Sequence, residues 1–183
     1  MKTIKRIAAL LLGTTLLLGL LSGCGNKKQR NEKLVLNVGV CGAIDSLDPA
    51  MNTDTDADSI FHALYENLMR ESDDGSGEVM LTNGMAKEYT EETNYDGTVT
   101  YRFTLRSTAR WSDGEKVTAD DFVYAWQRLA DPATNSPNHS LMSVVAGYDE
   151  VRETGNKAKL QVSAKDKSTF VVTPVSYTHL TLP

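Results

Sequence analysis

The sequence predicts a mixed α/β fold, with α+β character in the later part of the chain. Residues 99–106 alternate apolar and polar side chains, which is the pattern of a half-buried strand. Residues 118–131 begin with capping residues and then place apolar side chains at helical spacing. Residues 34–40 are rich in apolar and β-branched side chains, as in a strand that is buried on both faces. Both types of element therefore contribute to the fold.

The first 24 residues have the organisation of an export signal. Lys2, Lys5 and Arg6 form a positively charged segment, and an apolar run follows at residues 7–21. A helix that spans a membrane needs roughly 20 apolar residues, so this shorter run favours a cleaved signal over a permanent anchor.

Residues 21–24 read Leu-Ser-Gly-Cys, which resembles the lipobox of bacterial lipoproteins. The resemblance implies cleavage before Cys24 and acylation of its thiol and new amino group, and several acyl chains on one residue anchor a protein durably. The alternative is an ordinary cleaved signal with an incidental cysteine. Residues 25–33 contain no apolar side chain and predict a flexible tether.

The charge balance argues against a nucleic-acid partner. Residues 1–24 hold three of the 19 basic residues and no acidic one, which leaves 16 basic and 24 acidic residues and a formal charge of −8. No basic stripe with interleaved aromatic residues offsets this acidic character.

An acidic loop at residues 52–58 partly matches a calcium-binding loop. Asp54, Asp56 and Asp58 occupy its first three ligand positions, but Ser59 replaces the required Gly and Tyr65 stands in place of the bidentate Glu. We therefore expect no metal site, and instead a loop whose last Asp-Ser caps the next helix.

That next helix is predicted over residues 59–69, because Ile60 and the apolar residues four and eight positions later fall on one face. His62 lies on it as a lone imidazole, and a surface role is expected rather than a ligand role. Cys41 has no motif partner and is expected to be a small buried apolar residue.

Turn residues predict three hairpins. Residues 73–77 are predicted to be a polar hairpin loop. A turn at 94–97 precedes the strand at 99–106, whose expected partner is the segment 87–91. A third hairpin is predicted over 161–173 around a turn at 165–167.

The helix at 118–131 has clear predicted ends. Thr118 is the expected N-cap, and the two Asp residues in the first turn are favoured by the helix dipole. Asp131-Pro132 ends the helix.

Several stretches resemble the oligopeptide-binding family, the solute-binding proteins of peptide-importing ABC transporters. They are residues 46–49 (SLDP), 101–106 (YRFTLR), 110–114 (RWSDG), 117–128 (VTADDFVYAWQR) and 131–134 (DPAT). The resemblance implies the type II periplasmic-binding-protein fold, with mixed sheets, flanking helices and a cleft that closes on the ligand.

On this resemblance the chain is expected to be an N-terminal fragment. Residues 34–65 correspond to the first segment of lobe I, and residues 66–175 correspond to the small extra domain of peptide binders. Residues 176–183 (SYTHLTLP) fit no family pattern and are interpreted as a non-native tail.

The resemblance also implies a function and its partners. The protein is expected to be a monomeric, lipid-anchored receptor that captures oligopeptides outside the cytoplasm, in the periplasm or on the outer face of the cell membrane. It delivers them to the membrane permease subunits of an ABC importer, and no cofactor is expected. Hinge closure around an extended peptide, whose backbone pairs as an added strand, is the implied mechanism.

The ligand-binding positions follow from the same resemblance. Counted from the Ser-Leu-Asp-Pro turn, the family's peptide-contacting loop falls on Thr53, Asp54 and Thr55, and a Tyr at the family's peptide site corresponds to Asn138. These positions carry other residues than the family usually has, so the resemblance transfers the place and not the side chain. The apolar residues of the helix at 118–131 are expected to be core.

No catalytic motif is present in the sequence. Gly-x-Ser-x-Gly, His-Glu-x-x-His, Cys-x-x-Cys and a phosphate-binding Gly-rich loop are all absent, so we expect no enzyme. Two alternatives to peptide import stay open, namely a binder of nickel, haem, sugar or opine from the same family and a peptide-pheromone receptor lipoprotein.

Overall fold

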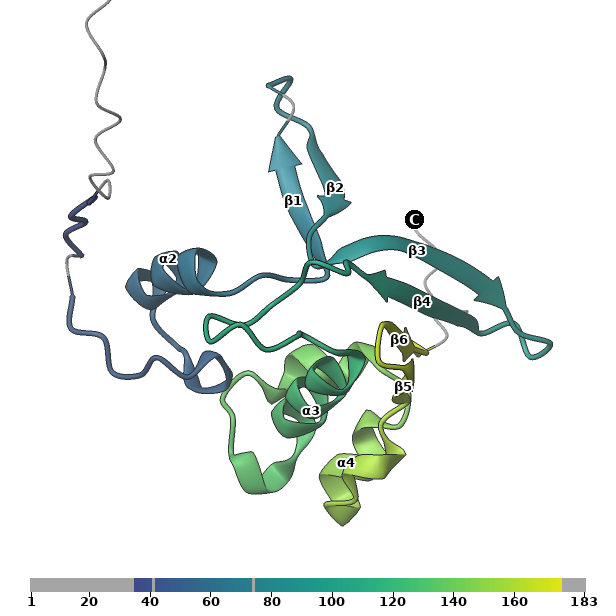
Figure 1. Ribbon diagram of the computed structural model, residues 1–183. Coiled ribbons are helices and arrows are strands. Elements are labelled where there is room, and N and C mark those ends of the chain that lie inside the picture. The colour runs from purple at the N-terminus through teal and green to yellow at the C-terminus, as the bar shows by residue number, and fades with distance from the viewer. Residues whose placement is uncertain (1–34, 41, 74, 176–183) are drawn as a thin grey trace, which may run out of the picture. The chain divides into compact units, whose positions relative to one another are not determined.

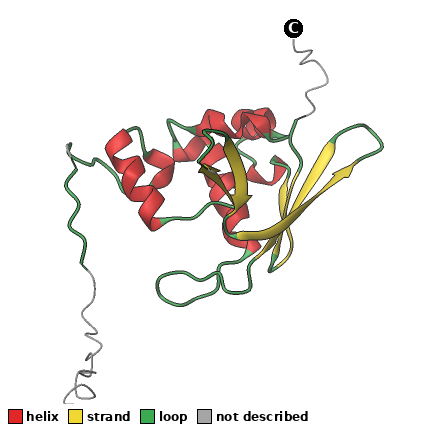
Figure 2. Cartoon of the chain, turned by 90° about the horizontal axis from the view of Figure 1, so that it is seen from above, coloured by secondary structure: helices red, strands yellow, loops and turns green. Residues whose placement is uncertain are grey.

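The computed structural model describes residues 35–40, 42–73 and 75–175 (Figures 1 and 2). Residues 35–39 belong to one unit of the chain, and the described residues from Val40 onward belong to a second. The predicted signal with Cys24, the tether, Cys41 and the tail lie outside the described residues. Among those that are described, no helix has the length and apolar character needed to cross a membrane.

The second unit is built on a four-stranded antiparallel sheet with the order β3-β4-β6-β5. Its strands are β3 (Ala86–Thr93), β4 (Val99–Leu105), β5 (Val162–Asp166) and β6 (Thr169–Val172). Tyr101 of β4 pairs with Glu91 on one side and with Val172 on the other. These pairings confirm the predicted strand at 99–106 and its partner at 87–91. They also confirm the predicted hairpin that contains β5 and β6.

Helix α3 (Ala119–Ala130) packs against β5 and β6. It begins after Thr118, as predicted. The Asp121 carboxylate accepts hydrogen bonds from the backbone N–H of Thr118 at 2.7 Å and from the Thr118 hydroxyl at 3.0 Å. Asp131 ends the helix and starts the short helix η2 (Pro132–Thr134), where its carboxylate accepts the N–H of Ala133 at 2.9 Å.

The ring of Phe170 on β6 is completely buried between α3 and β4. Its centroid lies 5.1 Å from that of Trp126, 5.8 Å from that of Phe122 and 6.4 Å from that of Phe103. Aromatic pairs at such distances add to the stabilisation from buried area. The prediction that the apolar face of α3 belongs to the core is confirmed.

After η2, three further helical segments lead to β5. They are η3 (His139–Val144), α4 (Tyr148–Thr154) and η4 (Lys157–Lys159). Gly147, just before α4, has a φ of 82°, and a Cβ atom at this position would collide with the backbone carbonyl of Lys159. Glycine permits both the left-handed conformation and this close approach.

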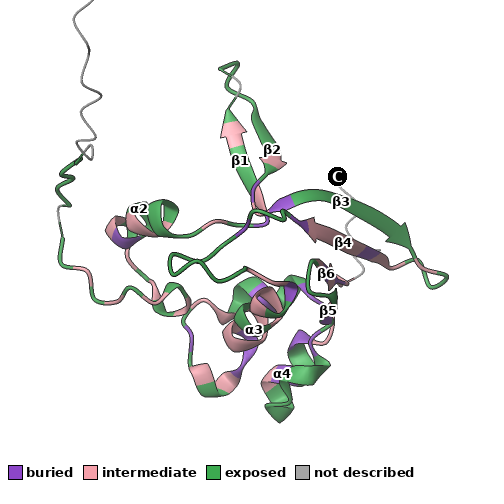
Figure 3. Cartoon of the chain, in the orientation of Figure 1, coloured by how far each residue is buried: buried purple, intermediate pink, exposed green. Residues whose placement is uncertain are grey.

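A separate hairpin of β1 (Met69–Asp73) and β2 (Val79–Asn83) projects from the four-stranded sheet (Figure 1). The polar residues predicted as a hairpin loop connect its strands. Most of the hairpin is exposed (Figure 3), and Val79 and Leu81 are 69% and 70% exposed. A two-stranded ribbon of this kind gains little stability from its own packing.

Helix α2 (Thr55–Leu64) corrects the prediction of a helix at 59–69. It starts earlier because the Asp54 carboxylate accepts the N–H of Asp56 at 2.9 Å and caps the first turn, where the sequence indicated a cap at 58–59. It ends earlier because the carbonyl of Leu68 accepts hydrogen bonds from Gly84 and Ala86, so this residue joins the sheet region and is buried in the core.

The strand predicted at 34–40 is wrong for the residues that the structure describes. Residues 35–40 pair with no described strand, and Val35, Leu36 and Val38 are 73%, 81% and 74% exposed. Apolar and β-branched side chains favour an extended backbone, but a strand also needs a hydrogen-bonded neighbour.

Candidate functional site

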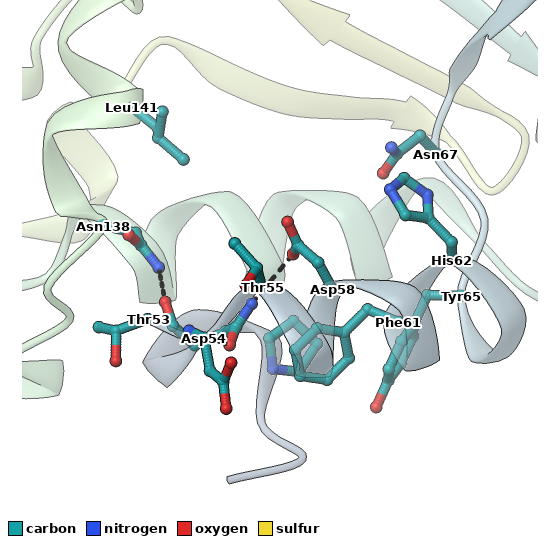
Figure 4. Close-up of a pocket in the computed structure, with 12 residues that line it drawn as sticks. Thr53, Asp54, Thr55, Asp58, Phe61, His62, Tyr65, Asn67, Asn138 and Leu141 are labelled. Atoms are coloured by element: carbon teal, nitrogen blue, oxygen red, sulfur yellow. Dashed lines mark hydrogen bonds between the residues drawn. The ribbon is translucent and has the colours of Figure 1, made fainter. Parts of the chain in front are cut away.

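A pocket of about 480 Å³ opens in the second unit between α2, η3 and the short helix η1 (Pro49–Met51) (Figure 4). Its volume is within the range of small-ligand sites, roughly 300–1,000 Å³. Polar, acidic and aromatic side chains form its wall: Pro49, Asn52, Thr53, Asp54, Thr55, Asp58, Phe61, His62, Tyr65, Asn67, Asn138 and Leu141.

All four predicted ligand-binding positions lie on this one pocket. Thr53, Asp54 and Thr55 lead into α2, and Asn138 immediately precedes η3. The two segments meet where Nδ2 of Asn138 donates a hydrogen bond to the backbone carbonyl of Asn52 at 2.5 Å (Figure 4). The structure thus brings together positions that are distant in sequence, and their contact with a peptide stays a prediction.

Asn52 determines the local geometry of the pocket wall. Its Oδ1 accepts the backbone N–H of Asp54 at 2.9 Å, and its Nδ2 donates to Oδ1 of Asp58 at 3.0 Å. One side chain therefore bonds both the loop before α2 and the first turn of that helix. The side chains of Thr53 and Thr55 are exposed at this wall.

The charged groups on the pocket wall are acidic. The carboxylates of Asp54 and Asp58 lie there together with the imidazole of His62, and no Lys or Arg is among the lining residues. Such a wall favours ligand groups that donate hydrogen bonds or carry positive charge.

An ion pair lies just outside the pocket, at the start of η1. The terminal nitrogens of Arg128 donate hydrogen bonds to both carboxylate oxygens of Asp48. These bonds hold the pKa of the Asp48 carboxyl below its ordinary value of 3.8, against the opposing effect of burial. The same hydrogen bonds raise the pKa of the Arg128 guanidinium.

The sequence did not indicate the apolar part of the wall. Phe61 and Tyr65, whose ring centroids are 6.0 Å apart, and Leu141 border the pocket. Their helical spacing is also that of core residues, so the pattern gave no signal for a site. His62 is exposed, in agreement with its predicted surface role, and it borders the pocket as well.

Two of the three carboxylates of the acidic loop are bonded to groups of the protein. Asp54 caps α2, and Asp58 accepts a hydrogen bond from Asn52. Within the described part of the chain, no group of three or more His, Cys, Asp or Glu side chains is arranged to hold a metal ion.

Comparison with known families identifies the chain. Residues 81–182 match the middle part of the bacterial extracellular solute-binding proteins, family 5. The chain belongs to this family. Family 5 consists of solute-binding proteins and not of enzymes.

Curated relatives of this family 5 protein include two periplasmic oligopeptide-binding proteins named OppA. The chain is 34% identical to the Haemophilus influenzae protein over 84% of its length and 39% identical to the Escherichia coli K12 protein over 80%. It covers 28% and 26% of those relatives, so it spans about a quarter of their length.

Solved structures confirm the predicted fold class, the mixed α/β type II periplasmic-binding-protein fold. Haemophilus influenzae OppA in complex with RPPGFSPFR is 37% identical with a TM-score of 0.61, over 72% of this family 5 chain and 26% of OppA. The pheromone receptor PrgZ is 32% identical with a TM-score of 0.63, over 72% of this chain and 25% of PrgZ.

Proposed function

We propose that this protein is an extracytoplasmic, lipid-anchored solute-binding protein that captures oligopeptides for import by an ABC transporter. The observation that carries the proposal is the 34–39% identity to two oligopeptide-binding proteins over at least 80% of the chain. Relatives whose names or structures refer to bound peptides support it further.

The pocket is suited to part of an extended peptide. Hydroxyl groups of Thr53 and Thr55 and the carboxylate of Asp58 can bond the amides or a basic side chain of a ligand. Phe61 and Tyr65 provide an apolar surface for a ligand side chain. A wall that combines polar, acidic and apolar groups is not specific for one side chain, so it can accept many peptide sequences.

The remaining parts of the proposal rest on the sequence. The predicted signal and Cys24 would anchor the protein outside the cytoplasmic membrane, close to the permease subunits to which it delivers the ligand. We propose that the protein acts as a monomer, and that hinge closure around the peptide distinguishes the loaded form from the empty one.

Isothermal titration of the full-length gene product with tri- to pentapeptide mixtures tests this function. We expect binding at micromolar or lower concentrations to peptides of several sequences, and no binding to an equimolar mixture of free amino acids. Saturation by a metal ion, haem, a sugar or an opine, with no response to any peptide, would refute the proposal.

A peptide-pheromone receptor is the second candidate, and the similarity to PrgZ favours it. Such a receptor discriminates among peptides, whereas an import protein accepts many. If one peptide binds at least a hundredfold more tightly than scrambled versions of itself, the pheromone-receptor function is correct and general import is not.

A further inference from the structure

Three side chains from the segment 128–138 hold three alternate residues of the loop before α2. Arg128 bonds the carboxylate of Asp48, the Ser136 hydroxyl donates to the carbonyl of Ala50 at 2.5 Å, and Nδ2 of Asn138 donates to the carbonyl of Asn52 at 2.5 Å. We call these contacts, formed by Asp48, Ala50, Asn52, Arg128, Ser136 and Asn138, the clasp.

The clasp is most sheltered from water at Ser136. Ser136 is only 2% exposed, and its Oγ also accepts the backbone N–H of Asn138 at 3.1 Å. Asn52 and Asn138 are partly buried. Hydrogen bonds in such surroundings are costly to break, because the freed groups do not regain all of their contacts with water.

The clasp continues into the pocket, because its members Asn52 and Asn138 both line it. Asn138 bonds the backbone of Asn52, and the side chain of Asn52 bonds Asp54 and Asp58. The position of the pocket wall at residues 53–55 therefore depends on contacts made by Arg128, Ser136 and Asn138, of which Asn138 also lines the pocket.

We propose that Asn138 and Ser136 are positioning residues that order the loop before α2, here called the ligand loop, before a ligand arrives. In this assignment Asn138 acts through Asn52 and does not bind the ligand with its amide nitrogen. Order in the empty protein strengthens binding because the ligand no longer has to fix a mobile loop. The statement about ligand affinity rests on the proposed function, whereas the statement about loop order does not.

The test compares Asn138→Asp with a matched control in the full-length protein. Asn138→Asp replaces the donor to the Asn52 carbonyl by an acceptor of the same size. The control is Asn83→Asp on β2, where Nδ2 of Asn83 donates to the carbonyl of Lys87 at 2.6 Å, at a site outside the pocket. Hydrogen exchange of residues 48–58 is measured without ligand, and peptide affinity is measured by titration.

We expect Asn138→Asp to speed amide exchange in residues 50–56 by about tenfold and to weaken peptide binding, whereas Asn83→Asp changes neither. Lowering the pH toward about 4 protonates the introduced carboxyl and returns a donor, so the exchange difference from wild type should shrink. If Asn138→Asp does not fold, Ser136→Ala and Arg128→Lys provide the same comparison, with smaller expected changes.

Other outcomes overturn the positioning role. Weaker binding with unchanged exchange makes Asn138 a direct ligand contact. Faster exchange with unchanged affinity would show that the order of the loop does not affect ligand binding. If neither exchange nor affinity changes, the clasp does not order the loop. If the wild type binds no peptide at all, the proposed function fails, and the exchange measurement alone decides whether the clasp orders the loop.

Discussion

Replacing Asp48 with Asn removes the charge from the clasp but keeps an oxygen that can accept the backbone N–H of Ala50, now bonded at 3.1 Å. In the wild type, Nη1 of Arg128 donates to Oδ1 of Asp48 at 2.8 Å, and Nη2 donates to Oδ2. The side chains of Arg128 and Asp48 are 35% and 34% exposed, so water screens the pair only in part.

The size of the effect follows from this partial exposure. Exposed ion pairs contribute roughly 0.2–1 kcal/mol, and loss of one partner from a buried pair costs about 3–5 kcal/mol. Because a third of each side chain is in contact with water, we expect Asp48→Asn to lower the free energy of unfolding by about 1–2 kcal/mol.

The same pair predicts a pH dependence. A carboxyl whose pKa is depressed on folding stabilises the protein above its unfolded pKa, and this contribution is lost as the pH falls through the folded pKa. The pKa of Asp48 lies below 3.8 in the folded protein. The stability difference between wild type and Asp48→Asn should therefore be complete at pH 7 and diminish only below about pH 4.

Chemical denaturation at several pH values measures this difference, and a double-mutant cycle with Arg128→Met isolates the pair. Asp120→Asn is the control, because it breaks an exposed pair between the same helix and the β5–β6 turn, in which Lys167 and Asp120 are 82% and 57% exposed. Equal effects of Asp48→Asn and Asp120→Asn, or a loss that is independent of pH down to about 3, would refute the reasoning.

Three further predictions concern the core, a backbone contact and the anchor. Phe170→Ala should lower the free energy of unfolding by about 3–5 kcal/mol, measured by denaturation, because it empties the space between α3 and β4. Gly147→Ala should cost at least about 1–3 kcal/mol in the same assay, since the added methyl group requires a strained φ and meets Lys159; an unchanged midpoint would contradict this. Cys24→Ser should move the protein from the membrane to the soluble fraction on cell fractionation, and continued membrane association would rule out the lipid anchor.

Two elements whose signals lie within a short stretch of the sequence were predicted correctly. The alternation along β4 and the capping of α3 by Thr118 and Asp121 are encoded in neighbouring residues, and the structure confirms them. The boundaries of α2 were wrong because two Asp residues could each cap it, and the end of the helix depends on Leu68 meeting the distant residues Gly84 and Ala86.

The candidate site was located by family spacing, and the binding of a peptide there stays a prediction. Family spacing located Thr53, Asp54, Thr55 and Asn138, and the structure brings them to one pocket. The clasp could not be read from the sequence, because its partners are 80 to 86 residues apart and no periodic pattern links them.

The substitution at position 138 has a physical explanation in the clasp. A Tyr, which the family pattern has there, carries its only polar group at the far end of a ring, whereas Asn138 holds a donor close to the backbone and reaches the carbonyl of Asn52 at 2.5 Å. The short amide thus suits a residue that bonds the backbone of the neighbouring loop.

Helix α3 connects this loop to the core. Trp126 packs on Phe170, while Arg128, about 200° further around the helix, bonds Asp48 at the start of the loop. Any shift of α3 relative to the sheet would therefore strain both the aromatic cluster and the clasp. The apolar face of α3 belongs to the core, as its sequence predicted, and through Arg128 the same helix also bonds the loop before α2.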